Sequence, residues 1–263
     1  MSRQGIALVG LLVGSVAWAQ APGTAPPAAP AAGPDQLTPV LQRWEKEMSA
    51  VRTLAAQCVR TEVNKTFGYT ETYVGGARYM KLEAGGRVAN LAVLEMAKKD
   101  KPDLFEKFVC TGDFLYQYVP QQKEIRVHAL PPPKPGQVSD DSFLSFLFGM
   151  KADDAFGRYE LALQNPADSH YHYILIKPKQ AQDKADFQQA RLVLSKETYL
   201  PRQLWFEQPT GDHVTWDIPK VQSGVNLDRR EFTAPEPPAG WKVVKVPPRN
   251  AEAAPRVVRP QQP

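Results

Sequence analysis

The sequence predicts a mainly β (α+β) fold: a single strongly curved antiparallel sheet, or incomplete β-barrel, of about ten to eleven strands. Three observations predict it. Many short segments alternate apolar and polar residues, turn residues separate those segments at hairpin-length intervals, and only two segments have a helical pattern. We expect an N-terminal amphipathic helix and a short apolar helix that lids or plugs the concave face of the sheet.

The first 20 of the 263 residues have the pattern of a secretory signal peptide. Arg3 provides the positive start, residues 5–17 form the apolar run, and Ala17-Trp18-Ala19 provides a cleavage site before Gln20. The apolar run is too short for a transmembrane helix, which needs about 20 residues. We therefore expect an exported protein, periplasmic or secreted, that is soluble after cleavage and has no transmembrane segment in the mature chain.

Residues 21–34 contain five prolines and are otherwise rich in alanine and glycine. This composition predicts a disordered linker. The tail, residues 247–263, is rich in proline and arginine without apolar periodicity and is also expected to be disordered. The sequence thus predicts one folded domain, residues 35–246.

Residues 35 to about 53 are predicted to form the amphipathic helix. Asp35 is a suitable N-cap, and the apolar positions that follow recur at helical spacing. They include Trp44 and Met48, which are expected either to pack in the core or to contribute to a ligand site.

Downstream, turn residues such as Gly85-Gly86, and Gly75-Gly76 inside one segment, accompany eleven segments with strand patterns. They are residues 55–65, 70–82, 88–96, 105–110, 114–119, 125–130, 158–163, 171–177, 187–194, 202–207 and 213–220. In two of them, alternation groups Tyr116 with Tyr118 and Val214 with Trp216, and we expect these aromatic rings to face the interior.

The second helical segment, Asp140–Met150, has the sequence D-D-S-F-L-S-F-L-F-G-M. A helix that is apolar on nearly all sides must be buried. Two interpretations stay open: the segment fills the core beneath the sheet, or it lids a cavity that takes an apolar ligand.

The two cysteines of the chain, Cys58 and Cys110, lie in different predicted strands. Export to an oxidising compartment favours a disulfide between them, which would stabilise the fold by about 4 kcal/mol. The alternative is that both are small buried side chains, because non-neighbouring strands would hold them too far apart.

The sequence contains no pattern typical of an enzyme. His170 and His172 share a strand face but lack a third metal ligand, and the pairs Asp140/Asp141 and Asp153/Asp154 suit helix or turn boundaries. No nucleophile motif or phosphate-binding glycine loop is present. We therefore expect no catalytic residue, no metal and no cofactor. The formal charge of +4 is spread along the chain, which argues against nucleic-acid binding.

Several motifs together resemble the LolA-like outer-membrane lipoprotein carrier superfamily. The segment T-G-D-F-L-Y-Q-Y-V-P at 111–120 is similar to the family's D-G-x-x-L-W-x-Y-x-P hairpin, Y-I-L-I-K-P-K at 173–179 to its L-x-P-K strand, and residues 231–241 to its closing F-x-x-P-P-x-G. The chain more closely resembles a group of uncharacterised secreted bacterial proteins that share D-D-x-F-L-S-F-L-F-G-M-K and P-R-Q-L-W-F. Where the carrier has a Lys-Arg-Pro that helps to lock its lid, this chain has Lys81-Leu82-Glu83.

The resemblance implies a half-barrel whose helices lid a hydrophobic cavity. The expected function is non-catalytic binding or transport of a lipid or a lipoprotein acyl chain. The expected partners are a lipid or acylated protein and a membrane-associated donor or acceptor protein. The alternative is an envelope sensor or protein-interaction module with a filled core. The residues predicted to line the cavity or its lid are Trp44, Met48, Tyr79, Tyr116, Tyr118, Phe143, Leu144, Phe146, Leu147, Phe148, Trp205 and Trp216.

Overall fold

The computed structural model describes residues 34–84, 87–130, 152–165 and 167–247. The predicted signal peptide, nearly all of the linker and tail, and the apolar segment 140–150 therefore lie outside the described residues.

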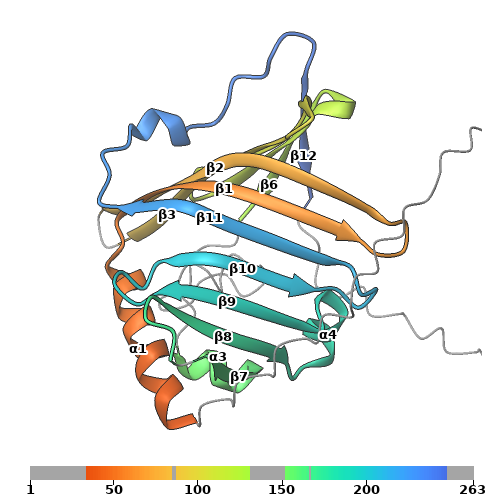
Figure 1. Cartoon of the computed structure of the whole chain (residues 1–263). Coiled ribbons are helices and arrows are strands. Elements are labelled where there is room, and N and C mark those ends of the chain that lie inside the picture. Colours follow the sequence, from red (N-terminus) through yellow and green to blue (C-terminus); the bar gives the residue numbers. More distant parts are fainter. Residues whose placement is uncertain (1–33, 85–86, 131–151, 166, 248–263) are drawn as a thin grey trace, which may run out of the picture.

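The described residues form one open, curved sheet of twelve strands, in the order β12-β6-β5-β4-β3-β2-β1-β11-β10-β9-β8-β7 (Figure 1). The predicted fold class is thus confirmed. The strands are β1 Thr53–Asn64, β2 Tyr69–Ala84, β3 Arg87–Lys98, β4 Lys101–Cys110, β5 Phe114–Val119, β6 Glu124–Ala129, β7 Tyr159–Gln164, β8 Tyr171–Pro178, β9 Gln189–Ser195, β10 Pro201–Glu207, β11 His213–Ser223 and β12 Lys242–Val246.

The twelfth strand was not predicted. β12 is only five residues long, follows a proline-rich stretch, and pairs in parallel with β6, whereas the other neighbouring strands pair antiparallel. Its K-V-V-K-V alternation is a weak signal, and the return of the chain to the β6 edge depends on tertiary contacts that a local pattern does not contain.

Within the described ranges, three α-helices accompany the sheet: α1 Pro34–Ala50, α3 Ala152–Arg158 and α4 Ala181–Asp186. Two short 3-10 helices, η1 Pro120–Gln122 and η2 Arg229–Phe232, lie in connections. The amphipathic character predicted for α1 is confirmed, because Leu37, Leu41 and Trp44 are almost completely buried. The helix ends three residues earlier than predicted, since β1 already begins at Thr53. The backbone N–H of Ala152 donates to Oε2 of Glu45 at 3.0 Å, which ties the start of α3 to α1.

The sheet is covered on both faces. Leu54 of β1 pairs with Tyr79 of β2, and both pack with α1, α3 and strands β7 to β10 in what we call the inner cluster. The next residue of β2, Met80, packs instead with Val93, Phe232 and others in a second, outer cluster. Because successive side chains of a strand point to opposite faces, the two clusters lie on opposite sides of the sheet.

The C-terminal segment, residues 224–246, crosses the outer face on its way to β12 (Figure 1). Phe232 of η2 is 2% exposed within the outer cluster. Trp241 stacks with Phe105 at 6.4 Å and contacts Tyr118 at 5.7 Å between ring centroids. The side chain of Glu231 forms an ion pair with Arg78 of β2 at 2.8 Å. This segment therefore covers the outer face of the sheet in the region of strands β2 to β6.

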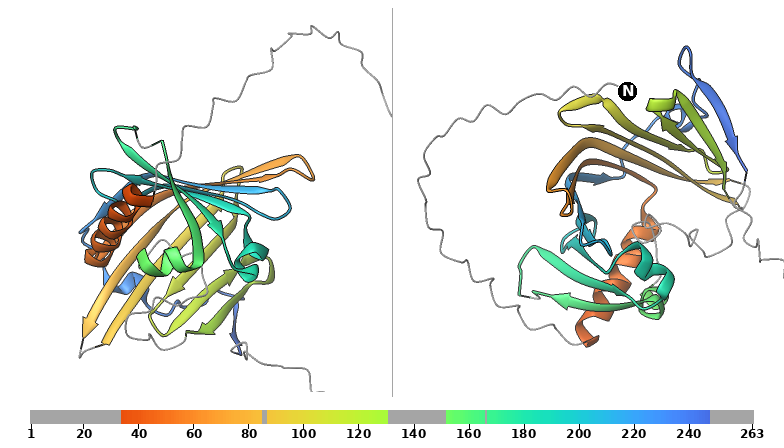
Figure 2. Two further views of the ribbon diagram at one scale, coloured as in Figure 1. Left: turned by 90° about the horizontal axis from the view of Figure 1, so that it is seen from below. Right: turned by 90° about the vertical axis from the view of Figure 1, so that its right-hand side faces the viewer.

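The Gly75-Gly76 pair has the composition of a turn, but it falls inside the predicted strand segment 70–82 and lies in the middle of β2. A Cβ atom on Gly75 would lie 1.9 Å from the carbonyl oxygen of Glu95 on β3, and one on Gly76 would lie 2.8 Å from the carbonyl oxygen of Ala56 on β1. Glycine inside a strand often marks a close approach of two backbones. Here it permits close backbone contact at the middle of the curved sheet (Figure 2).

Candidate functional site

The inner face of strands β3, β4 and β5 has a group of apolar side chains that we call the apolar strip. Tyr79, which packs against the inner cluster, pairs with Ala92 of β3. Ala92 therefore lies on the inner face as well. Directly paired residues share a face. The register therefore defines the strip as Ala92, Leu94, Phe108, Cys110 and Leu115.

The residues of the apolar strip are all only partly buried. None of them is a member of the inner or the outer cluster. Among the described residues, α1 and α3 pack against the other half of the sheet. The strip is thus an apolar surface without a described helix packed on it, on the face that curves inward (Figure 2).

A group of charged residues together with one tyrosine, which we call the charged cluster, borders the strip at one end of the strands. It comprises Arg60, Glu62, Glu71, Tyr73, Lys98 and Glu106. Arg60 of β1 is 9% exposed and binds Glu106 of β4 through two hydrogen bonds, Nη1 to Oε2 at 2.7 Å and Nη2 to Oε1 at 2.6 Å. It also forms an ion pair with Glu62 at 2.8 Å.

Two aromatic rings enclose the same guanidinium. Its carbon lies 4.3 Å from the ring centroid of Tyr73 and 5.2 Å from that of Trp216. Burial raises the pKa of Tyr73 to about 12 and raises the pKa of Glu62 above its ordinary value. Lys98 donates to Glu71, which lowers the pKa of that carboxyl. The charges of this cluster are satisfied by one another, so it provides a polar boundary rather than a set of free reactive groups.

Four of the predicted cavity residues lie together. Trp44 and Met48 of α1 are 2% and 5% exposed in the inner cluster, and Tyr79 and Trp216 pack against it. The hydroxyl of Tyr79 donates to Oδ1 of Asn90 at 2.8 Å, and burial raises its pKa to about 12.

Three other predicted residues lie on the opposite face. Tyr116 and Tyr118 pack against the outer cluster, beneath the C-terminal segment. Trp205 follows Leu204, which is fully buried in the inner cluster, so Trp205 points away from it and contacts His213 instead. The expectation that Tyr116 and Tyr118 face the same interior as Trp216 therefore does not match the structure. The physical reason is that both faces of this sheet are covered, so aromatic alternation alone does not identify the inner one.

The five predicted residues of the apolar segment, Phe143, Leu144, Phe146, Leu147 and Phe148, lie outside the described residues. Their role as ligand contacts stays a prediction.

The two cysteines are free in the structure. Cys58 lies on β1 and Cys110 on β4, with β2 and β3 between them. Three strand spacings of about 4.8 Å exceed the Cα separation that a disulfide permits, unless the backbone moves. Burial raises the pKa of the Cys58 thiol to about 11 and also raises the pKa of Cys110. Burial therefore makes both thiols less reactive than an exposed cysteine.

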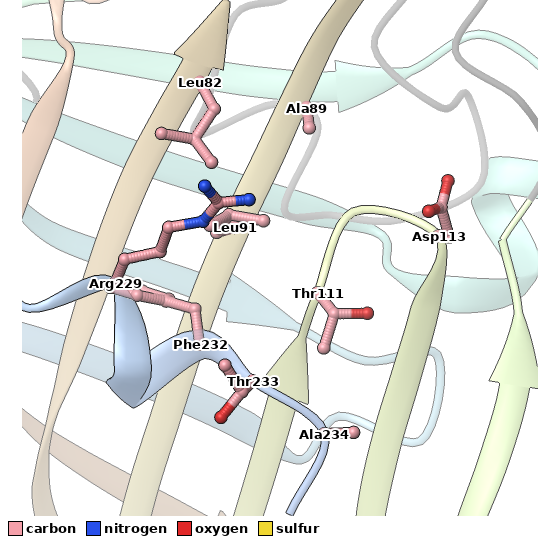
Figure 3. Close-up of a pocket in the computed structure, with 9 residues that line it drawn as sticks. All are labelled: Leu82, Ala89, Leu91, Thr111, Asp113, Arg229, Phe232, Thr233 and Ala234. Carbon is pink, nitrogen blue, oxygen red and sulfur yellow. The ribbon is translucent and has the colours of Figure 1, made fainter. Parts of the chain in front are cut away.

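On the outer face, the C-terminal segment leaves a shallow pocket of about 340 Å³ against β2, β3 and the β4–β5 turn (Figure 3). Leu82, Leu91 and Phe232 form its apolar floor, and the guanidinium of Arg229 extends over them. Asp113 lies on the far side of the same pocket. Within the described ranges, no group of His, Cys, Asp and Glu side chains is arranged to hold a metal ion.

Sequence reasoning missed the apolar strip. Each of Leu94, Phe108 and Leu115 has at least one apolar or aromatic neighbour on the opposite face, namely Val93, Val109 and Tyr116, so neither face of β3, β4 or β5 stood out as the apolar one. The informative signal was the pairing register, which links them to Tyr79.

Comparison with known proteins finds similar folds but no similar sequences. No protein-family profile and no curated protein matches the chain. Among solved structures, an uncharacterized conserved protein from Thermus thermophilus is 13% identical with a TM-score of 0.47, covering 80% of this chain and 99% of that one. A putative outer membrane lipoprotein-sorting protein domain from Vibrio parahaemolyticus is 12% identical with a TM-score of 0.39, covering 74% and 95%.

A LolA superfamily protein from Nitrosomonas europaea is 10% identical with a TM-score of 0.30, covering 74% of this chain and 96% of that one. Solved structures described as lipoprotein-sorting and LolA superfamily proteins are thus among those found, at TM-scores below 0.5. None of the helices in the described ranges has the length and apolarity required to cross a membrane.

Proposed function

We propose that the protein is an exported, non-catalytic binding or carrier protein for an acyl chain, supplied by a lipid or by an acylated protein. The single observation that carries this proposal is the apolar strip: partly buried apolar side chains on the inward-curving face of β3, β4 and β5, outside both packed clusters. Ligand sites are typically concave and mostly apolar, with few polar groups.

Partition is sufficient as a mechanism. Each buried CH₂ group contributes about 0.8 kcal/mol, so a long acyl chain laid along the strip gains affinity without a covalent step. The strip continues into Tyr79 on one side, and along the strands it stops at the charged cluster, where Trp216 stacks on Arg60. An acyl chain is therefore expected to lie across β3–β5, where no charge has to be desolvated.

The proposal includes no catalytic residue. The charged residues that border the strip are held in ion pairs and stacked contacts, and the described residues show no nucleophile hydrogen-bonded to a general base near the strip. Release would then depend on a membrane-associated donor or acceptor protein, or on competition by the phenylalanines of segment 140–150.

Lipid extraction of the purified protein followed by mass spectrometry tests for a resident ligand. Titration with a fluorescent fatty acid then measures the affinity of wild-type protein and of Leu94→Asp, which places a charge in the strip. We expect the affinity to fall at least tenfold, because the charge must be desolvated beside the ligand.

Val74→Asp is the matched control, because Val74 lies on the outer face of β2 and is 39% exposed. If Leu94→Asp is unfolded by circular dichroism, Phe108→Ser provides the same test with a neutral side chain. A protein that is extracted without lipid and ignores the fluorescent fatty acid contradicts the proposal and favours the sensor or interaction module.

A further inference from the structure

The tip of the hairpin that joins β1 and β2 exposes two aromatic rings. Phe67 is 77% exposed and Tyr69 is 48% exposed. Among the large apolar or aromatic side chains of the described residues, Phe67 has the highest exposed fraction, and only Val243, at 49%, ranks between it and Tyr69. Their rings stack on each other, with centroids 6.5 Å apart and planes inclined by 18°. Neither ring contributes to the inner or the outer cluster.

Hydrogen bonds fix the conformation of this tip. The backbone N–H of Phe67 donates to Oδ1 of Asn64 at 2.8 Å, and Gly68 has the positive φ of 67° that the turn requires. The neighbouring β10–β11 hairpin also supports the tip, because Asp212 accepts from the backbone N–H of Lys65 at 2.8 Å and from Nδ2 of Asn64 at 3.3 Å. The two rings are thus presented outward by a defined turn.

The tip also projects beyond its neighbour on the other side, β3. β2 begins at Tyr69, but its pairing with β3 begins only at Tyr73, opposite Lys98. Figure 2 shows the β1–β2 hairpin extending past the rest of the sheet beside the β10–β11 hairpin. A flat surface could therefore contact Phe67 and Tyr69 before it met the body of the domain.

Lys65 is the charged residue of the tip segment itself, and the acidic Asp212 and Glu207 contact the segment from the neighbouring β10–β11 hairpin. Residues 64–70, N-K-T-F-G-Y-T, include Lys65 and no acidic residue. The Lys65 side chain is 54% exposed, and its distance to Oε1 of Glu207 is 3.7 Å, which is a weak surface contact. An aromatic pair with an adjacent exposed cation is complementary to the headgroup region of an anionic bilayer, where aromatic rings are enriched and lysines are attracted.

We propose that the tip of the β1–β2 hairpin docks the protein on an anionic lipid bilayer by placing Phe67 and Tyr69 in the interface, with Lys65 contacting the headgroups. A membrane fits better than a protein partner, because two rings and one cation are far below the roughly 800 Å² per partner that a stable protein interface buries. A shallow interfacial anchor needs only such a small patch and binds reversibly. The proposal does not depend on acyl-chain binding by the inner face.

Vesicle flotation tests the proposal. The purified protein is mixed with vesicles of phosphatidylglycerol and phosphatidylethanolamine, and in parallel with vesicles of phosphatidylcholine alone. We expect binding to the anionic vesicles, and a loss of about tenfold in the partition coefficient for the double variant Phe67→Ser/Tyr69→Ser. Lys65→Ser should remove most of the dependence on salt that the wild-type protein shows.

Phe114→Ser is the matched control, since Phe114 is 42% exposed but lies at the opposite end of the strands, at the start of β5. It should bind vesicles as the wild type does. Fluorescent fatty-acid affinity measured on the same variants should not change, which separates this proposal from the proposed function. Absence of vesicle binding by the wild type, or equal binding by the double variant, overturns the proposal. The proposal is also overturned if the only effect of the double variant is a loss of self-association, which size-exclusion chromatography detects.

Discussion

Arg60 divides the inner face into an apolar and a charged part. Its guanidinium is nearly buried, stacks on Tyr73 and Trp216, and binds Glu106, a residue two strands beyond its neighbour β2. A carboxylate from β4 can reach β1 only because the sheet curves toward this face. The Arg60–Glu106 pair therefore connects the charge boundary of the proposed site to the curvature of the sheet.

Glu106→Gln should destabilise the protein by about 1–3 kcal/mol, because it removes one charge from a pair whose other member stays buried. The free energy of unfolding from urea denaturation measures the loss. Glu83→Gln is the control, since Glu83 forms an ion pair with Arg52 in which both side chains are about half exposed. Such surface pairs contribute about 0–1 kcal/mol. Equal effects of the two substitutions would show that the inner pair has no special role.

At the scale of single residues, the sequence predicted which side chains are buried better than it predicted the face of the sheet on which they lie. The helical spacing of Trp44 and Met48 was sufficient to bury both against the sheet. Tyr116 and Tyr118 were correctly grouped on one face, but alternation is symmetric, and the C-terminal segment that covers their face lies more than a hundred residues away in the sequence. Only the pairing register that links these strands to Tyr79 shows which face of the sheet is the inner one.

At the scale of elements, all eleven predicted strands form, because each has local alternation bounded by turn residues. β12, α3 and α4 were not predicted: they are five, seven and six residues long, and such short segments depend on packing rather than on propensity. Gly75 and Gly76 have the composition of a turn but serve as the place where β2 approaches both neighbours.

Gly75→Ala should be strongly destabilising, by about 2 kcal/mol or more, because the new methyl group would overlap the backbone carbonyl of Glu95. The melting temperature, followed by circular dichroism, measures the change. Gly157→Ala is the control: Gly157 lies in α3 and a Cβ there meets no atom within 4 Å. Alanine at that position should leave stability unchanged or raise it by up to about 1 kcal/mol. A tolerant Gly75 would mean that β2 and β3 are further apart than described.

At the scale of the whole molecule, one open sheet has two different faces. The C-terminal segment and Phe232 close the outer face, whereas on the inner face α1 and α3 pack over one half and the apolar strip occupies the other. This asymmetry is the reason why we assign acyl-chain binding to the inner face and treat the projecting hairpin tip as a separate contact with the membrane.

The most direct test of this assignment is cross-linking with a photoactivatable fatty acid, followed by peptide mapping to single residues. We predict cross-links on the inner-face residues Leu94, Phe108 and Leu115. The neighbouring outer-face residues Val93, Val109 and Tyr116 should carry few or none, because successive strand residues point to opposite faces. Cross-links concentrated on Val93, Val109 and Tyr116 would contradict the assignment, as would labelling spread equally over both sets.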